Sequence, residues 1–255
     1  NNELPWYGEK GWPTTADRSM LSRYMRLAPQ APGKVELIKF LKTYYKNDLA
    51  ALKKEWDVAA DSFDDFAKQR KITPKARESA QAVVEWSGVV AEQYIKLCSE
   101  AIRRYDPNHL FLGVRFSNRA QQPVMAACGK YCDVISMNIY RKTGVFDEGL
   151  CGAVAALTGK PIMITEFSWR AMENTSDCKN SAGADVTVQT QQDRADSFRK
   201  YATTALAQPY LVGYDWFQYH DQPTSGRFDG EDCNYGLVDI HDQPCTTLLA
   251  AITES

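Results

Sequence analysis

Two short stretches of the chain each place one glutamate beside amide or aromatic side chains. Residues 1–6 read NNELPW and contain Glu3, and residues 161–169 read PIMITEFSW and contain Glu166. Two carboxyl groups can hydrolyse a glycosidic bond with retention when one is the nucleophile and the other acts first as acid and then as base. Glu166 ends an apolar run, where a charge is costly unless it has a purpose. Glu166 is therefore the stronger candidate, and an ordinary surface role is the alternative for Glu3.

Polar and aromatic side chains also follow the other apolar runs of the chain. A sugar presents C–H faces that stack on aromatic rings, and its hydroxyl groups bind amide, guanidinium and phenol groups. Tryptophan at such positions also packs in protein cores, so a structural role is the alternative for the tryptophans. The candidates for contact with a sugar are Trp6, Arg115, Asn138, Tyr140, Trp169, Trp216, His220 and Asp221.

Short apolar runs and helical patterns alternate from residue 109 onward, and these elements must position the candidate side chains. The sequence predicts strands at 109–116, 133–140, 160–167 and 210–219, and its last helices at about 191–207 and 246–253. Continuous apolar strands separated by helices are typical of parallel βαβ units. Because polar groups follow successive strands, an α/β fold of the (β/α)8 TIM-barrel type is favoured over an open doubly wound sheet. No GxGxxG motif follows any strand, which also disfavours a dinucleotide-binding sheet.

The first part of the chain is predicted to be helical. Apolar residues recur at helical spacing over 36–54, with a break at Asn47 and Asp48, so two consecutive helices are expected. A long helix should end near Arg104, before the sequence DPNH, and Cys98 lies on its apolar side as a buried thiol.

Composition and charge exclude several classes of protein. The 255 residues are 44% hydrophobic and 24% charged, which is typical of a globular protein with a sizeable core. The net charge is −2 and basic residues do not cluster, so nucleic acid is not an expected partner. No apolar run reaches 18 residues, so no membrane span is expected. Cys128 and Cys132 form a CxxxC without further ligands at zinc spacing, so we expect no metal and no cofactor.

The seven cysteines suggest an oxidising compartment. Six of them lie in sequence that resembles loops, and Asn174 begins an NTS glycosylation pattern. We therefore expect disulfide bonds, with at least one cysteine left over, and a secreted protein in an extracellular or periplasmic location. The pairing of the cysteines is open.

At these motifs the chain resembles the glycoside hydrolases of clan A, most of all agarase-like and beta-galactosidase-like members. The Asn-Glu pair that follows barrel strand four in that family is matched by Asn2 and Glu3. The glutamate that ends strand seven is matched by Glu166, the tyrosine after strand six by Tyr140, and the tryptophan on strand eight by Trp216. The likeness extends over nearly the whole chain, and several segments match in the same order.

The resemblance implies a role for each matched residue. Glu3 would be the general acid/base and Glu166 the nucleophile, while Asn2 would hold the 2-hydroxyl of the sugar. Tyr140 would orient Glu166, and Trp216 would form the floor of the subsite where the bond is cleaved. The loop residues Arg227, Asp229 and Glu231 are further candidates to line a substrate groove.

The resemblance also implies a division of the barrel. The chain would supply strands five to eight and the end of strand four, as the C-terminal portion of one catalytic domain over 1–255. Residues 12–90 would be a helical insert after strand four, and 91–255 would contain the βα repeats. The N-terminal half of the barrel would come from the same precursor or from a second chain, since a half-barrel leaves an open parallel edge.

The sequence is therefore compatible with two classes of function. The first is a retaining glycoside hydrolase that cleaves a polysaccharide or oligosaccharide with two glutamates, acting on a galactan such as agar. The second is a carbohydrate-binding or structural barrel remnant without turnover. Loss of hydrolysis in variants of either glutamate would favour the first class, and binding without hydrolysis would favour the second.

Overall fold

The structure is a computed structural model and describes residues 19–75 and 79–255. The chain divides into two compact units. The described part of the first unit contains residues 112–118 and 133–255, and we call it the sheet unit. The described part of the second contains residues 19–75, 79–111 and 119–132, and we call it the helical unit.

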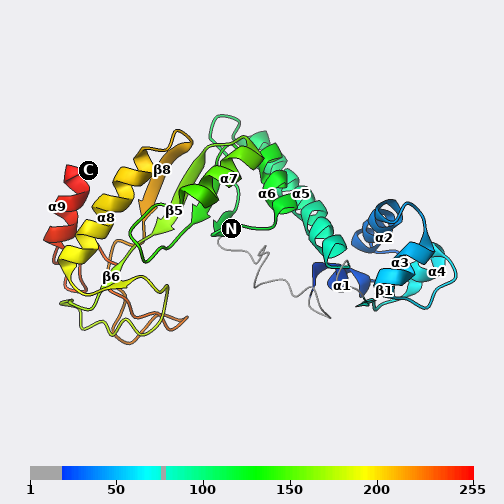
Figure 1. Ribbon diagram of the computed structural model, residues 1–255, viewed down its shortest axis with the longest axis horizontal. Helices are drawn as coiled ribbons and strands as arrows, with labels where there is room; N and C mark the ends of the chain where they lie inside the picture. Colours follow the sequence, from blue (N-terminus) through cyan, green and yellow to red (C-terminus); the bar gives the residue numbers. More distant parts are fainter. Residues whose placement is uncertain (1–18, 76–78) are drawn as a thin grey trace. The chain divides into compact units, whose positions relative to one another are not determined.

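The helical unit is built from α-helices and one short antiparallel strand pair (Figure 1). Asp48 caps the third helix by accepting hydrogen bonds from the N–H groups of Ala50 and Ala51, and Lys46 and Asn47 before it have φ of 51° and 60°. The predicted break at this point is therefore confirmed. The elements are α1 (Met20–Met25), α2 (Pro32–Tyr44), α3 (Leu49–Glu55), β1 (Trp56–Asp57), α4 (Phe63–Lys68), β2 (Thr73–Pro74), α5 (Ser79–Tyr105) and α6 (Gln122–Tyr131).

Helix α5 crosses the predicted boundary between the helical insert and the βα repeats. The boundary expected between residues 90 and 91 falls inside this continuous helix, which runs from Ser79 to Tyr105. The compact units also assign α5 and α6 to the same body. The predicted insert and the predicted βα repeats are therefore joined by one helix.

A lysine lies in the core of the helical unit. The side chain of Lys34 is fully buried, and its Nζ donates to the carbonyl oxygens of Met25 and Gln69 at 2.7 Å each. Burial, assisted by the nearby charge of Arg70, lowers the pKa of Lys34 to about 8. Lys34 therefore ties α2 to the end of α1 and to the residue after α4.

We expect the stability of the helical unit to rise as pH increases from about 8 towards 10.5. In this window the unfolded chain holds a proton on Lys34 that the folded chain has released, so folding becomes more favourable with pH. Urea unfolding midpoints of the wild type and of Lys34→Met at pH 7, 8, 9 and 10 would test this. The wild type should gain stability relative to the variant across the series, and parallel curves would contradict the assignment.

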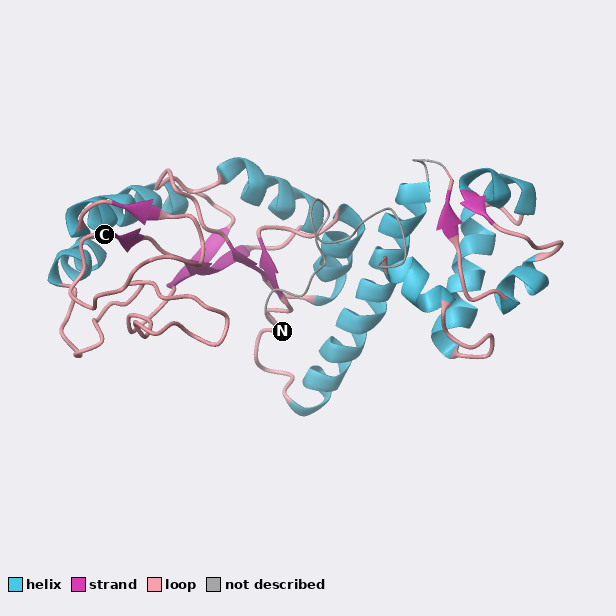
Figure 2. Ribbon diagram, turned by 90° about the horizontal axis from the view of Figure 1, so that it is seen from below, coloured by secondary structure: helices cyan, strands magenta, loops and turns pink. Residues whose placement is uncertain are grey.

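The sheet unit contains a four-stranded parallel sheet in the order β3-β4-β5-β8. Figure 2 shows its strands in magenta, with helices covering one side. Each strand pairs with the next strand of the sheet along the chain, and no reversal of order occurs among the described residues. The elements are β3 (Arg115–Ser117), β4 (Ile135–Asn138), α7 (Glu148–Thr158), β5 (Ile162–Phe167), α8 (Gln191–Leu206), β8 (Leu211–Trp216) and α9 (Thr246–Glu254).

This architecture confirms the predicted α/β fold with a parallel sheet. The predicted helices at about 191–207 and 246–253 are present as α8 and α9, which pack against each other (Figure 1). The strand predicted at 109–116 is shorter, because Gly113 has φ of +69° and the ladder begins only at Arg115. Local caps explain the helix bounds: Thr190 and Asp193 form a capping box at the start of α8, and Gly159 ends α7 in the left-handed region.

An aromatic cluster joins α8 to the sheet. The ring of Phe167 stacks on Tyr201 at 4.3 Å between centroids, and it contacts Trp216 edge to face at 5.5 Å. Phe198 lies 6.1 Å from Phe167 in a stacked arrangement. Such ring pairs add to the burial of apolar area. The cluster therefore fixes the ends of β5 and β8 relative to each other.

Two long loops follow these strands and are bonded together. The loop after β5 contains β6 (Arg170–Ala171) and β7 (Thr187–Val188), which pair in parallel. Ser176 Oγ donates to Asp221 Oδ2 at 2.6 Å, and Ser181 Oγ donates to Asp232 Oδ2 at 2.7 Å. Both acceptors belong to the loop after β8, so the two loops form one hydrogen-bonded layer.

The cysteines differ from the prediction. All seven are free thiols in the structure, and Cys128 and Cys151 lie inside helices α6 and α7 instead of loops. Cys98 is half-buried and not fully buried as expected. Burial raises the pKa of the Cys151 and Cys178 thiols to about 12, so neither is a reactive thiolate at neutral pH. The disulfide prediction is therefore not supported by the described fold.

We expect protein purified without reductant to present seven titratable thiols after denaturation. The native protein should react much more slowly with a thiol reagent, because five of the seven cysteines are buried. Counting thiols with a chromogenic disulfide reagent, before and after denaturation, tests both statements. Five or fewer thiols in the denatured protein would indicate a disulfide.

Within the described residues, no helix has the length and apolar character needed to cross a membrane.

Candidate active site at the carboxyl ends of the strands

The candidate residues of the sheet unit lie where the parallel strands end. Asn138 of β4 is in register with Ser117 of β3 and with Glu166 of β5. Phe167 of β5 is in register with Trp216 of β8. Because parallel strands end at the same edge, this register places the predicted groups in one row.

Glu166 lies in this row, and two side chains of the described residues, Arg115 and Tyr140, donate to it. The residue is 9% exposed, and its Oε1 forms an ion pair with Nη2 of Arg115 from β3. The hydroxyl of Tyr140 donates to Oε2 of Glu166 at 3.0 Å. Charge-assisted hydrogen bonds of this kind stabilise a carboxylate that has lost much of its water. The carboxylate is therefore fixed in orientation by a side chain from the start of β3 and one from the segment that follows β4.

The arginine and the tyrosine are themselves positioned by the backbone. Arg115 Nη2 also donates to the carbonyl oxygen of Thr165 at 2.9 Å, which anchors the guanidinium to β5. Arg141 Nη1 donates to the carbonyl oxygen of Tyr140 at 3.0 Å, and Asp147 holds the same guanidinium at 2.7 Å. Arg141 was missed by the sequence analysis, although its place next to Tyr140 at a strand end is a signal that could have identified it.

Asn138 and Trp169 lie deeper than the sequence analysis expected. Asn138 is 1% exposed, and its Oδ1 accepts from Thr165 Oγ1 at 2.8 Å, so it bridges β4 and β5. Trp169 is also 1% exposed, and its Nε1 donates to the carbonyl oxygen of Arg141 at 2.9 Å. Of the two readings given for Trp169, its burial favours the structural one. Contact of either side chain with a sugar stays a prediction.

Trp216 is half-buried at the end of β8. Its Nε1 donates to the carbonyl oxygen of Tyr235 at 2.8 Å, and the guanidinium of Arg194 lies 5.3 Å from the ring centroid. Arg194 is fully buried on α8 and also donates to the carbonyl oxygens of Trp169 and Gly236 at 2.8 Å each. Its spacing of four and seven residues from the buried Phe198 and Tyr201 was a signal of this orientation, which the sequence analysis did not use.

His220 and Asp221 have separate environments despite being adjacent. His220 is exposed, and its Nε2 contacts Asp242 Oδ1 at 2.7 Å. Asp221 is 7% exposed and accepts hydrogen bonds from Ser176 Oγ at 2.6 Å and from the N–H of Gly236 at 2.7 Å. Burial raises the pKa of Asp221. Asp221 therefore joins the two loops, and its contact with substrate stays a prediction.

Asn2, Glu3 and Trp6 lie outside the described residues. The separation of the Glu3 and Glu166 carboxyl groups stays a prediction.

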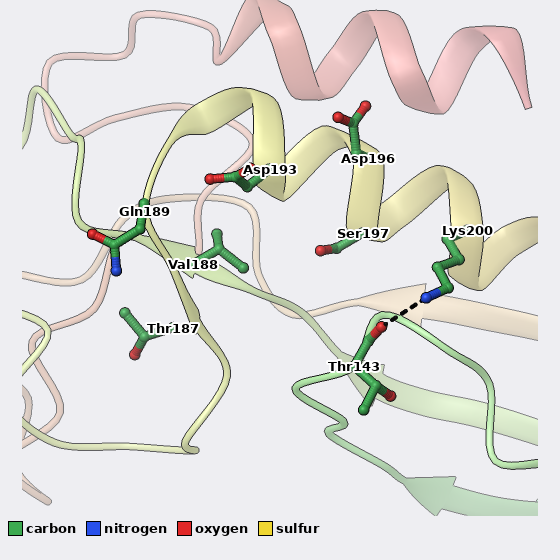
Figure 3. A pocket seen from close by; sticks show the side chains of 8 residues that line it. All are labelled: Thr143, Thr187, Val188, Gln189, Asp193, Asp196, Ser197 and Lys200. Atoms are coloured by element: carbon green, nitrogen blue, oxygen red, sulfur yellow. Dashed lines mark hydrogen bonds between the residues drawn. The ribbon is translucent and has the colours of Figure 1, made fainter.

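A separate open surface pocket of about 420 Å³ lies beside the start of α8 (Figure 3). Figure 3 shows a lining of hydroxyl, amide and charged side chains, with Lys200 Nζ bonded to the carbonyl oxygen of Thr143 at 3.4 Å. None of the predicted site residues lines it, and it offers no aromatic ring for a sugar. The lining residues are Thr143, Thr187, Val188, Gln189, Asp193, Asp196, Ser197 and Lys200.

Over residues 19–75 and 79–255, no group of three or more His, Cys, Asp or Glu side chains is arranged to hold a metal ion.

Comparison with known proteins finds relatives that are similar in sequence. Beta-agarase A of Vibrio sp. (strain JT0107) is 32% identical to the chain over 234 residues, and beta-agarase B of the same strain is 30% identical over 228 residues. The chain is similar to beta-agarases. The alignments cover 89% and 87% of this chain, but the chain spans 23% of the length of each of these relatives. No family model matches the chain.

Solved agarase structures share the fold. The crystal structure of the agarase AgWH50C matches with a TM-score of 0.82 and 28% identity, covering 100% of this chain and 35% of that chain. The structure of an exo-beta-agarase matches with a TM-score of 0.82 and 29% identity, covering 100% of this chain and 34% of that one. The similarity to agarases therefore extends over both units described above.

Proposed function

We propose that the chain is part of a retaining glycoside hydrolase that cleaves a galactan such as agar. The observation that carries the proposal is the Glu166 carboxylate, held by Arg115 and Tyr140 at the carboxyl ends of parallel strands. The similarity to beta-agarases supports both the class of reaction and the class of substrate.

In this mechanism Glu166 is the nucleophile and Glu3 the general acid/base. The Glu166 carboxylate attacks the anomeric carbon while Glu3 protonates the departing oxygen, which gives a covalent glycosyl-enzyme. Glu3 then takes a proton from water, the resulting hydroxide attacks the same carbon, and Glu166 is released. Arg115 and Tyr140 keep the nucleophile oriented for both displacements.

The substrate contacts in this proposal come from several segments. Trp216 forms the floor of the subsite where the bond is cleaved, and Asn2 binds the 2-hydroxyl of the sugar. Trp6 and the exposed His220 also contact the sugar in this proposal. Asn138, Trp169 and Asp221 support the site from within the fold.

We also propose that β3, β4, β5 and β8 are strands five to eight of a (β/α)8 barrel of the clan A type. Parallel strands in chain order and polar groups at their carboxyl ends support this assignment. A closed barrel needs eight strands, and the parallel sheet of the described residues has four. The remaining strands would come from an N-terminal half in the same precursor or in a second chain. We further propose a secreted enzyme, in keeping with an extracellular polysaccharide as substrate.

Digestion of a panel of polysaccharides by the full-length protein tests the function. Agar is expected to give oligosaccharides whose newly formed ends keep the anomeric configuration, as followed by NMR during the first turnovers. Cellulose, xylan and starch serve as controls and should remain intact. Absence of products from every galactan, or an inverted product, would contradict the proposal.

The variant Tyr140→Phe is expected to lower kcat by about 10- to 100-fold with little change in KM. It removes the hydroxyl that donates to Glu166 Oε2 at 3.0 Å, and a hydrogen bond to a charged group contributes about 1.5–3 kcal/mol, which corresponds to a change on this scale. Tyr210→Phe is the matched control, since the Tyr210 hydroxyl donates to the carbonyl oxygen of Glu148 at 3.2 Å. Equal effects of the two substitutions would exclude a special role for Tyr140.

A further inference from the structure

Phe228 is an aromatic ring that the fold leaves in water. It is 99% exposed, and it lies in the loop after β8. An apolar ring gains free energy when it is covered, and Phe228 is the most exposed of the large apolar side chains among the described residues. Neither the fold nor the mechanism above uses this side chain.

The loop that carries Phe228 is tightly bonded. The N–H of Arg227 donates to the carbonyl oxygen of Glu231 at 2.8 Å, and the N–H of Gly230 donates back to the carbonyl oxygen of Arg227 at 2.9 Å. Gly226 and Gly230 have φ of +82° and +88°, a region that favours glycine. The turn therefore presents Phe228 in a defined direction, at its tip.

The side chain of Arg227 fastens this turn to the end of β8. Its guanidinium is paired with Asp229 and lies 3.7 Å from Glu231 Oε2. The same group lies 5.8 Å from the ring centroid of Phe217 and 5.6 Å from that of Phe228. Arg227 thus lies between an aromatic residue at the strand end and the exposed ring.

This turn is close to the candidate nucleophile. The N–H of Phe217 donates to the carbonyl oxygen of Phe167 at 3.0 Å, and Phe167 is the residue after Glu166. The carboxylate of Glu166 also contributes to raising the pKa of Arg227, after the larger effect of the bond to Asp229. Phe228 therefore belongs to the same edge of the sheet as Glu166.

We propose that Phe228 is a stacking platform for a neutral galactose unit of the substrate, at a subsite beyond the one where the bond is cleaved. This inference rests on the proposed function. One face of a galactose ring carries the C–H groups of carbons 3, 4 and 5 and fits an aromatic ring. The charge of Arg227 is paired with Asp229 and lies near Glu231, so these three residues together carry one net negative charge. This charge disfavours an anionic sugar and is compatible with a neutral one.

The test measures binding apart from hydrolysis. Full-length protein with Glu166→Gln is run in native polyacrylamide gels that contain increasing amounts of soluble agar, with and without Phe228→Ala. We expect Phe228→Ala to weaken the apparent affinity by about 3- to 10-fold, the range of one aromatic contact, and Phe228→Trp to preserve it. Tyr105→Ala, which removes an 83% exposed ring from the helical unit, should leave the affinity unchanged.

The outcomes separate this inference from the proposed function. Equal retardation with and without Phe228→Ala overturns the inference, even if the wild type digests agar. Retardation that depends on Phe228, in a protein that digests no galactan, supports the inference while the hydrolase proposal fails. A change of oligomeric state in Phe228→Ala at unchanged retardation assigns the ring to a protein contact and overturns the inference.

Discussion

The variant Glu166→Gln is expected to lower kcat on agar by at least about a thousandfold, since an amide cannot form the covalent glycosyl-enzyme. The amide is nearly isosteric: its single oxygen can keep the bond from Arg115, and its NH2 group can donate to the Tyr140 hydroxyl in place of the oxygen that accepts from it, so the fold should be retained. Initial rates of release of reducing ends, combined with circular dichroism of the variant, measure the effect on chemistry apart from that on folding.

Glu148→Gln is the matched control for this variant. Glu148 is an exposed glutamate in the first turn of α7, in the same unit as Glu166. It should keep the activity of the wild type. A 2-deoxy-2-fluoro-galactoside with a good leaving group should trap the intermediate, and mass spectrometry of the digested protein should find the label on the peptide with Glu166. A label on another residue would remove Glu166 from the role of nucleophile.

The variant Glu3→Gln is expected to lose activity, and the loss should be larger for substrates whose leaving group has a higher pKa. Hydrolysis of agar should fall by about 10²- to 10⁴-fold, because the departing sugar oxygen needs a proton. An aryl galactoside with an acidic phenol as leaving group should retain much of the rate of its first step. Rates for a series of aryl galactosides, plotted against the pKa of the phenol, measure this dependence.

Glu9→Gln serves as the comparison, since Glu9 belongs to the same N-terminal stretch and was not singled out by any motif. A slope for Glu3→Gln equal to those of the wild type and Glu9→Gln would show that Glu3 does not protonate the leaving group. Another acidic residue would then have to be the general acid/base, with Glu166 as the nucleophile.

The parts of the fold that could be predicted are those with local signals. The helices α8 and α9 and the strands β4 and β5 follow from apolar spacing and from capping residues such as Thr190. The row of Arg115, Tyr140 and Glu166 could be anticipated because parallel strands end at one edge, so polar groups after successive strands must meet.

The parts that could not be predicted depend on contacts distant in the chain. Asp221 looks like an exposed loop acid, and only Ser176, 45 residues earlier, and Gly236 explain its burial. The spacing of Arg194 to Phe198 and Tyr201 places it on the buried face of α8, but the carbonyl acceptors that it needs there come from Trp169 and Gly236, 25 and 42 residues away in the chain.

The bonding between the two long loops has a consequence for protein engineering. Ser176 with Asp221, and Ser181 with Asp232, join the segment after β5 to the segment after β8. A grafted loop after β5 that lacks these serines would remove the Ser176 donor from the buried Asp221 and the Ser181 donor from the buried Asp232. Transfer of substrate preference between relatives should therefore succeed when both loops are replaced together. Sequence changes in the two loops should likewise occur together among relatives.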